Sequence, residues 1–160
     1  MIGKGQRMST GAAIATALLT GVGTAQADVG YSAASCAAGA AKSGDLVTTR
    51  NGEAFNKNTS TALDVLCPVV LLNTAAKLDV SLFLKKATAA SVTCFVHSRY
   101  DDGSGGVINT ATASGTGTKI VYIGNVSHFS TATTGCQLPK AISVNASGRT
   151  GIVSYFSSEY

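Results

Sequence analysis

Four cysteines limit how this 160-residue chain can fold more than any other feature of its sequence. They are Cys36, Cys67, Cys94 and Cys136, and no two of them are close together in the sequence. This spacing disfavours a zinc site and excludes a Cys-x-x-Cys redox motif, so we expect structural disulfides. Four cysteines allow three pairings. We predict Cys36–Cys67 and Cys94–Cys136, because each of these bonds joins nearby strands.

The N-terminal residues 1–27 predict an oxidising compartment for these cysteines. Lys4 and Arg7 open a segment with an apolar stretch at residues 12–19, and the segment ends in the small residues Ala25-Gln26-Ala27. This is the layout of a secretory signal peptide, so we expect cleavage after Ala27. Residues 28–160 then form a single domain in the periplasm or outside the cell, where disulfides persist. The apolar stretch is shorter than the about 20 residues of a membrane span, and no later segment qualifies.

Short alternating runs predict the architecture of residues 28–160. Apolar and polar residues alternate most clearly in 61–70, 77–84 and 91–99. Gly, Asn, Ser and Asp separate these runs, as turn residues do. We expect about seven strands in an antiparallel, immunoglobulin-like β-sandwich that two disulfides staple together. Residues 109–118 are almost all Thr, Ser, Ala and Gly, which predicts a mobile connection or a weak edge strand.

The same alternation places three aromatic side chains on outward faces. In residues 77–84 the leucines and Val80 point inward, so Phe83 points outward. Phe95 and Tyr122 lie outward by the same reasoning. Exposed aromatic residues on a sheet commonly mark a contact site, so Phe83, Phe95 and Tyr122 form a possible contact surface. The alternative is that they line the other half of the core, above all Phe95 in the middle of its strand.

The sequence contains no recognisable catalytic or metal-binding motif. Gly-x-Ser-x-Gly is absent, and Gly103-Ser104-Gly105 follows Asp101 and Asp102 in what reads as a solvated loop. Oxygen atoms of this loop offer calcium ligands, but the spacing fits no EF-hand. His97 and His128 have no visible partner for acid–base chemistry. We therefore predict that the protein is not an enzyme and uses no cofactor or metal.

Charge argues against a nucleic-acid partner. The net charge of +4 includes Lys4 and Arg7; of the 12 basic residues, 10 remain without them, against eight acidic ones. These basic residues are scattered, and only Lys85-Lys86 is a pair. A nucleic-acid-binding surface needs a basic stripe, often with stacking aromatic residues.

Several short motifs resemble a group of small, uncharacterised secreted bacterial proteins with two disulfides. The group shares a signal peptide, an early cysteine, an Asn-rich stretch before a Val-x-Cys-Pro strand, and three further strand motifs. The matching segments are Asn56-Lys57-Asn58-Thr59-Ser60-Thr61, Val65-Leu66-Cys67-Pro68, Val92-Thr93-Cys94, Cys136-Gln137-Leu138-Pro139 and Gly151-Ile152-Val153-Ser154-Tyr155. The resemblance implies a disulfide-linked β-sandwich. It implies no catalytic or binding residues, because the group has no established function.

Three classes of function remain, in decreasing order of preference. The first is a secreted or cell-envelope binding module for an extracellular partner that the sequence does not identify. The second is a structural subunit of a fimbria or coat, since the alternating segment 151–160 is able to add to a neighbouring sheet. The third is a small hydrolase.

Overall fold

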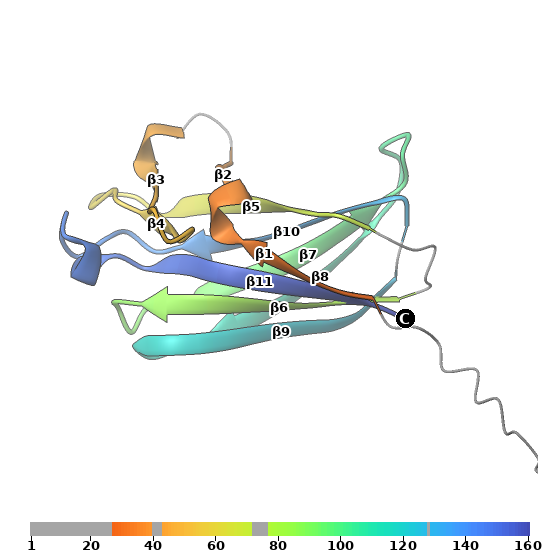
Figure 1. The fold of residues 1–160 in the computed structure, drawn as a ribbon. Helices are drawn as coiled ribbons and strands as arrows, with labels where there is room; N and C mark the ends of the chain where they lie inside the picture. The colour runs from red at the N-terminus through yellow and green to blue at the C-terminus, as the bar shows by residue number, and fades with distance from the viewer. Residues whose placement is uncertain (1–26, 40–42, 72–76, 128) are drawn as a thin grey trace, which may run out of the picture.

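The computed structural model describes residues 27–39, 43–71, 77–127 and 129–160 (Figure 1). These residues form eleven strands and three short 3-10 turns, η1 (Ala33–Ser35), η2 (Ser43–Asp45) and η3 (Ala146–Gly148). The strands make two antiparallel sheets, so the predicted β-sandwich is confirmed. Apart from Ala27, the predicted signal peptide lies outside the described residues. No helix in the described ranges is long and apolar enough to cross a membrane.

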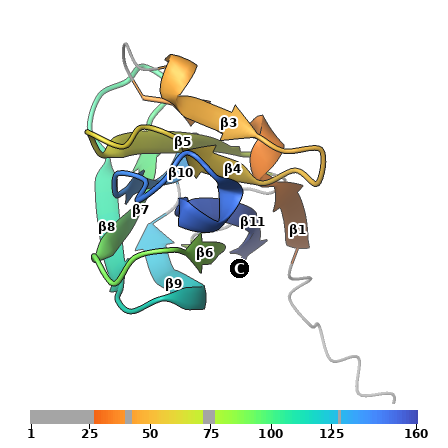
Figure 2. The ribbon, with the colours of Figure 1, turned by 90° about the vertical axis from the view of Figure 1, so that its left-hand side faces the viewer.

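Two sheets face each other across one core. Sheet A has the order β3-β4-β11-β6-β9, and β1 also pairs with β11; its strands are β1 (Ala27–Ser32), β3 (Leu46–Thr48), β4 (Ala54–Asn56), β6 (Lys77–Lys86), β9 (Gly117–Ser127) and β11 (Gly151–Glu159). Sheet B has the order β2-β5-β10-β7-β8; its strands are β2 (Ala37–Ala38), β5 (Leu63–Val69), β7 (Val92–Arg99), β8 (Val107–Ala113) and β10 (Thr131–Leu138). Figure 2 shows β1 and β8 on opposite sides of the molecule.

The strand pairs are nested. β7 pairs with β8, β6 with β9, β5 with β10, and β4 with β11. From β4 to β11, the first strand pairs with the last, the second with the second last, and so on inward to β7 and β8. This nested pairing is the topology of a jelly roll. An immunoglobulin domain has a different strand order, so the sandwich is as expected but its topology is not. Counting strands gives a layer architecture, whereas pairing depends on contacts between residues far apart in the sequence.

The inward apolar residues of the alternating strands fill the core, as the sequence predicts. In β6 the inward residues Leu78, Val80, Leu82 and Leu84 are buried, each at most 1% exposed. The inward residues of β5 and β7 meet them from sheet B. Residues 107–113 form β8 at the edge of sheet B, so the weak-edge alternative holds for this segment. The loop expected at 101–106 lies between β7 and β8.

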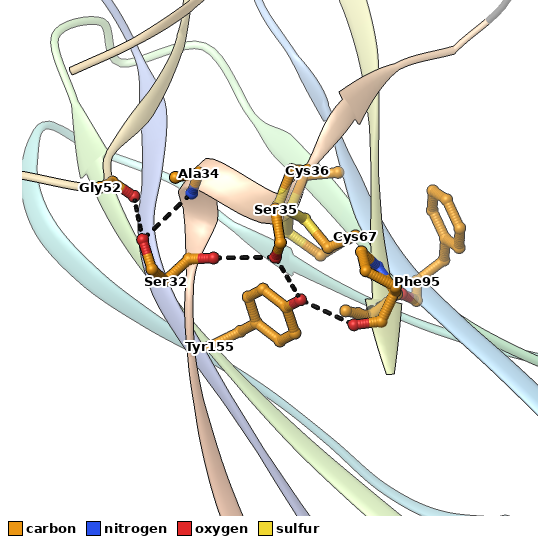
Figure 3. Close-up of a disulfide and its surroundings, with 12 residues drawn as sticks. Ser32, Ala34, Ser35, Cys36, Gly52, Cys67, Phe95 and Tyr155 are labelled. Atoms are coloured by element: carbon orange, nitrogen blue, oxygen red, sulfur yellow. Dashed lines mark hydrogen bonds between the residues drawn. A yellow bond between two sulfur atoms is a disulfide. The ribbon is translucent and has the colours of Figure 1, made fainter. Parts of the chain in front are cut away.

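Both predicted disulfides are present. Cys36–Cys67 and Cys94–Cys136 have S–S distances of 2.00 Å and 2.11 Å. Cys94 and Cys136 are direct partners across β7 and β10. Cys36 follows η1, so its bond to Cys67 ties the end of the N-terminal strand to β5 in sheet B (Figure 3).

Tyr31 and Tyr155, the tyrosine pair, join the sheets beside this disulfide. The rings stack with their centroids 4.7 Å apart. The Tyr155 hydroxyl donates to the Pro68 carbonyl of β5 at 2.6 Å, and it lies 3.0 Å from Ser35 Oγ (Figure 3). The Tyr31 hydroxyl donates to the Val70 carbonyl at 2.9 Å. Covalent and hydrogen bonds therefore hold β1 and β11 against β5 at one place.

Candidate functional site

The three aromatic residues predicted to form a contact surface lie on two faces. Phe83 in β6 and Tyr122 in β9 share the outer face of sheet A, where Phe83 is half-buried and Tyr122 is 59% exposed. Phe95 in β7 is half-buried on the outer face of sheet B. All three point outward, but they do not make one patch. Alternation gives the direction of a side chain and does not say to which sheet its strand belongs.

Two further apolar side chains complete a surface around Phe83 and Tyr122. Ile120 is 62% exposed and lies opposite Phe83, and Phe156 is 46% exposed in the adjacent β11. The rings of Phe83 and Phe156 meet edge to face with centroids 5.5 Å apart. We call Phe83, Ile120, Tyr122 and Phe156 the sheet A platform.

A glycine lets the platform extend over the N-terminal strand. Gly30 in β1 is the register partner of Phe156. A Cβ atom at this glycine would lie 2.7 Å from the Phe156 ring, so a larger residue would push the ring away. Neither Gly30 nor Phe156 was singled out from the sequence, although the inward position of Tyr155 implies an outward Phe156.

Beside the platform is a cavity of about 450 Å³ that two carboxylates, Asp28 and Asp79, help to line. Its lining residues are Asp28, Asp79, Ser81, Tyr122, Phe156, Ser157 and Ser158. The Tyr122 hydroxyl donates to Asp79 Oδ2 at 2.5 Å, while the Asn125 backbone N–H and the Tyr160 hydroxyl donate to Oδ1 at 2.7 Å and 3.2 Å. The hydrogen bond to Asp79 raises the pKa of Tyr122 to about 12. The hydrogen bond to Asp79 also holds the Tyr122 side chain in one orientation.

The outer face of sheet B carries a second depression, of about 490 Å³, which we call the sheet B hollow. Its lining residues are Leu66, Phe95, His97, Arg99, Thr131 and Thr133. Arg99 Nε donates to His97 Nε2 at 2.7 Å. Desolvation, and then the charge of Arg99, lower the pKa of His97, so the imidazole is neutral and accepts this bond.

The histidine and serine considered as catalytic candidates form hydrogen bonds with residues close to them in the sequence. His97 is paired with Arg99. Within its loop, Ser104 donates to Asp102 Oδ1 from Oγ at 2.6 Å and from its backbone N–H at 2.8 Å. These two hydrogen bonds lower the pKa of Asp102. His128 lies outside the described residues. Among those described, no three His, Cys, Asp or Glu side chains gather in a group able to hold a metal ion.

The fold is shared with solved carbohydrate-binding modules. The CBM36-1 domain of a multidomain xylanase from the hindgut metagenome of Trinervitermes trinervoides matches with a TM-score of 0.51 and 12% identity, over 84% of this chain and 98% of that domain. The xylan-binding module CBM15 matches with a TM-score of 0.55 and 12% identity, over 86% and 97%.

A third similar structure belongs to a larger protein. The CBM22-1–GH10 modules of Clostridium thermocellum xylanase 10B match with a TM-score of 0.55 and 10% identity, over 81% of this chain and 27% of that one. No family model and no curated protein matches the sequence. The chain is thus a disulfide-linked, two-sheet β-sandwich, and at these identities the likeness extends to the fold alone.

Proposed function

We propose that this protein is an extracellular, non-catalytic carbohydrate-binding module that contacts saccharides through the sheet A platform. The observation that carries the proposal is an exposed aromatic surface beside a fixed carboxylate. The C–H face of a sugar ring packs on the rings of Tyr122 and Phe156, and its hydroxyls donate to the Asp79 side-chain oxygens. The fold shared with a xylan-binding module and with a CBM36-1 domain supports the same class of function.

Two features of the chain support the extracellular setting of this proposal. Two disulfides are stable in an oxidising compartment, and residues 1–27 have the layout of a signal peptide. The intact mass of the secreted protein tests this step. A mature chain that begins at Asp28 is the expected result, and one that still begins at Met1 would contradict it.

The structure gives less support to a fimbrial or coat subunit. That hypothesis depended on the segment 151–160 adding to another sheet. In the structure β11 already has partners on both sides, with β6 on one and β1 and β4 on the other. The strand has no open edge to offer a second molecule along residues 154–159.

Binding to insoluble and soluble polysaccharides tests the platform. Xylan is the first probe, because the similar modules include a xylan-binding one. We expect Tyr122→Ala and Phe156→Ala to weaken retention of the protein in a xylan-containing native gel by about tenfold or more, since each removes a stacking surface. Tyr100→Ala is the matched control: Tyr100 is 49% exposed and lies beyond the end of β7, away from the platform.

Two outcomes contradict the proposal. The first is equal retention of the platform variants and the Tyr100→Ala control. The second is the absence of retention by every member of a panel of xylan, cellulose, galactan and mannan.

A further inference from the structure

We propose that the sheet B hollow is a second saccharide site, selective for an acidic sugar unit whose carboxylate pairs with Arg99. The ligand class is a hexuronic acid within an oligosaccharide. The hollow lies on the opposite sheet from the platform, so this inference does not depend on the platform binding any ligand.

A glycine beneath the hollow makes room for the Phe95 ring. Gly135 in β10 is the register partner of both Leu66 in β5 and Phe95 in β7. A Cβ atom there would lie 2.0 Å from the Val65 carbonyl oxygen and 3.0 Å from the Phe95 ring, so only glycine fits. The Phe95 ring therefore reaches over the buried glycine toward Leu66, and these two side chains give an apolar surface on which the C–H face of a sugar ring packs.

The cation at the end of the hollow is the exposed Arg99, which is bonded to His97. The bond from Arg99 Nε to the neutral His97 uses one donor of the guanidinium and leaves its two terminal NH₂ groups. Within the described part of the chain, no carboxylate forms an ion pair with Arg99. A planar pair of N–H donors without a carboxylate partner matches the two oxygens of a carboxylate ligand.

Few other charges face Arg99. On the neighbouring strand β10, Thr131 is the register partner of Arg99, and Thr133 is that of His97. Asp64 in β5 lies opposite Gln137, about 20 Å along β10 from Thr131, and accepts a hydrogen bond from Gln137 Nε2 at 3.1 Å. The acidic residues nearest in sequence, Asp101 and Asp102, are exposed in the following loop. The hollow therefore favours an anion.

The spacing of the lining residues sets the size of the ligand. Phe95 and Arg99 are four residues apart on one extended strand, which separates them by about 14 Å. The bond to His97 turns the guanidinium back toward the middle of this span, and two or three linked sugar units cover its whole length. Thr131 and Thr133 also line the hollow. The Thr131 hydroxyl donates to the Arg99 carbonyl at 3.3 Å, and its oxygen is still able to accept from a sugar hydroxyl. An oligosaccharide with a uronic acid at the Arg99 end fits these features.

Calorimetric titration with a trimer of galacturonic acid tests the assignment. We expect Arg99→Gln to weaken binding by about tenfold or more, and Arg99→Lys, which keeps the charge but loses the planar fork, to weaken it less. Arg50→Gln is the matched control, because it removes the same charge from an exposed turn between β3 and β4. Binding should also weaken as salt concentration rises.

The outcomes separate this inference from the proposed function. Loss of trimer binding in Arg99→Gln, with Tyr122→Ala unaffected, supports a separate acidic-sugar site even if xylan does not bind. Equal binding by Arg99→Gln and Arg50→Gln overturns it. Loss of binding in Tyr122→Ala alone assigns the trimer to sheet A and also overturns it. A sulfated galactan oligosaccharide that binds more tightly than the trimer overturns the choice of a carboxylate.

Discussion

At the scale of single residues, Asp79 is the group that orders the sheet A platform. Its carboxylate accepts from Tyr122, Asn125 and Tyr160, and these three residues follow it by more than 40 positions in the sequence. No local pattern brings such residues together. Phe83 and Tyr122 were predictable as outward from alternation, and Ile120 shares the parity of Tyr122. Asp79 is outward by the same alternation as Phe83, but its contact with Tyr122 was not predictable, because the pairing of β6 with β9 decides it.

The acidity of Tyr122 gives a direct test of this arrangement. Ionised Tyr122 would lose its hydrogen bond to Asp79 and would repel the carboxylate, which is why its pKa is raised to about 12. We expect Asp79→Asn to lower this pKa toward 10, measured by NMR titration of ¹³C-labelled tyrosine. Asp28→Asn, on the same face, is the control and should leave it unchanged. A Tyr122 pKa that stays near 12 in Asp79→Asn would show that another group causes the shift.

At the scale of strands, the sequence predicts where each strand lies in the chain better than it predicts which strands pair. β5, β6 and β7 fall within two residues of the runs expected at 61–70, 77–84 and 91–99. β8 was uncertain, because its outward residues include Thr110 and Thr112 and its composition resembles a linker. The cysteine pairing was the one part of the sequence prediction that placed distant segments of the chain next to each other. Cys94–Cys136 does join neighbouring strands, but it leaves open the order of the others, and so the jelly roll was missed.

The tyrosine pair shows how strands of different sheets are joined, and it yields a stability test. Tyr155 is fully buried, and its hydroxyl donates to the Pro68 carbonyl across the sandwich. We expect Tyr155→Phe to lower the free energy of unfolding by about 1–2 kcal/mol, because that carbonyl loses its donor. Urea denaturation followed by circular dichroism measures the change. Tyr100→Phe, at an exposed site, should alter stability by less than about 0.5 kcal/mol. Equal losses would contradict the role of the tyrosine pair.

At the scale of the whole molecule, the sandwich separates two chemically different faces. Sheet A presents the platform and Asp79, and sheet B presents the hollow and Arg99. The core between them is closed by the nested strand pairs and both disulfides. If both proposals hold, one molecule contacts a neutral and an acidic polysaccharide on opposite sides. Stability of the thin sandwich is then a condition of function, since loss of the core would remove both faces together.

The two disulfides should contribute nearly equally to that stability. They close loops with sequence separations of 31 and 42 residues, and the chain-entropy model gives about 4 kcal/mol for each. Because a small domain has a net stability of about 5–15 kcal/mol, either loss removes a large share of it. We therefore expect Cys36→Ala/Cys67→Ala and Cys94→Ala/Cys136→Ala to show similar, large decreases in the urea midpoint.

The comparison between these two double variants also tests where the stabilisation originates. Cys94 and Cys136 are already adjacent through the pairing of β7 with β10, whereas Cys36–Cys67 also holds η1 and the tyrosine pair against β5. If unfolded-chain entropy dominates, the two unfolding free energies agree within about 1 kcal/mol. A much larger loss for Cys36→Ala/Cys67→Ala would mean that native contacts around the N-terminal strand dominate. In that case Tyr155→Phe would cost less when combined with it than alone, because the two changes would disrupt the same contacts.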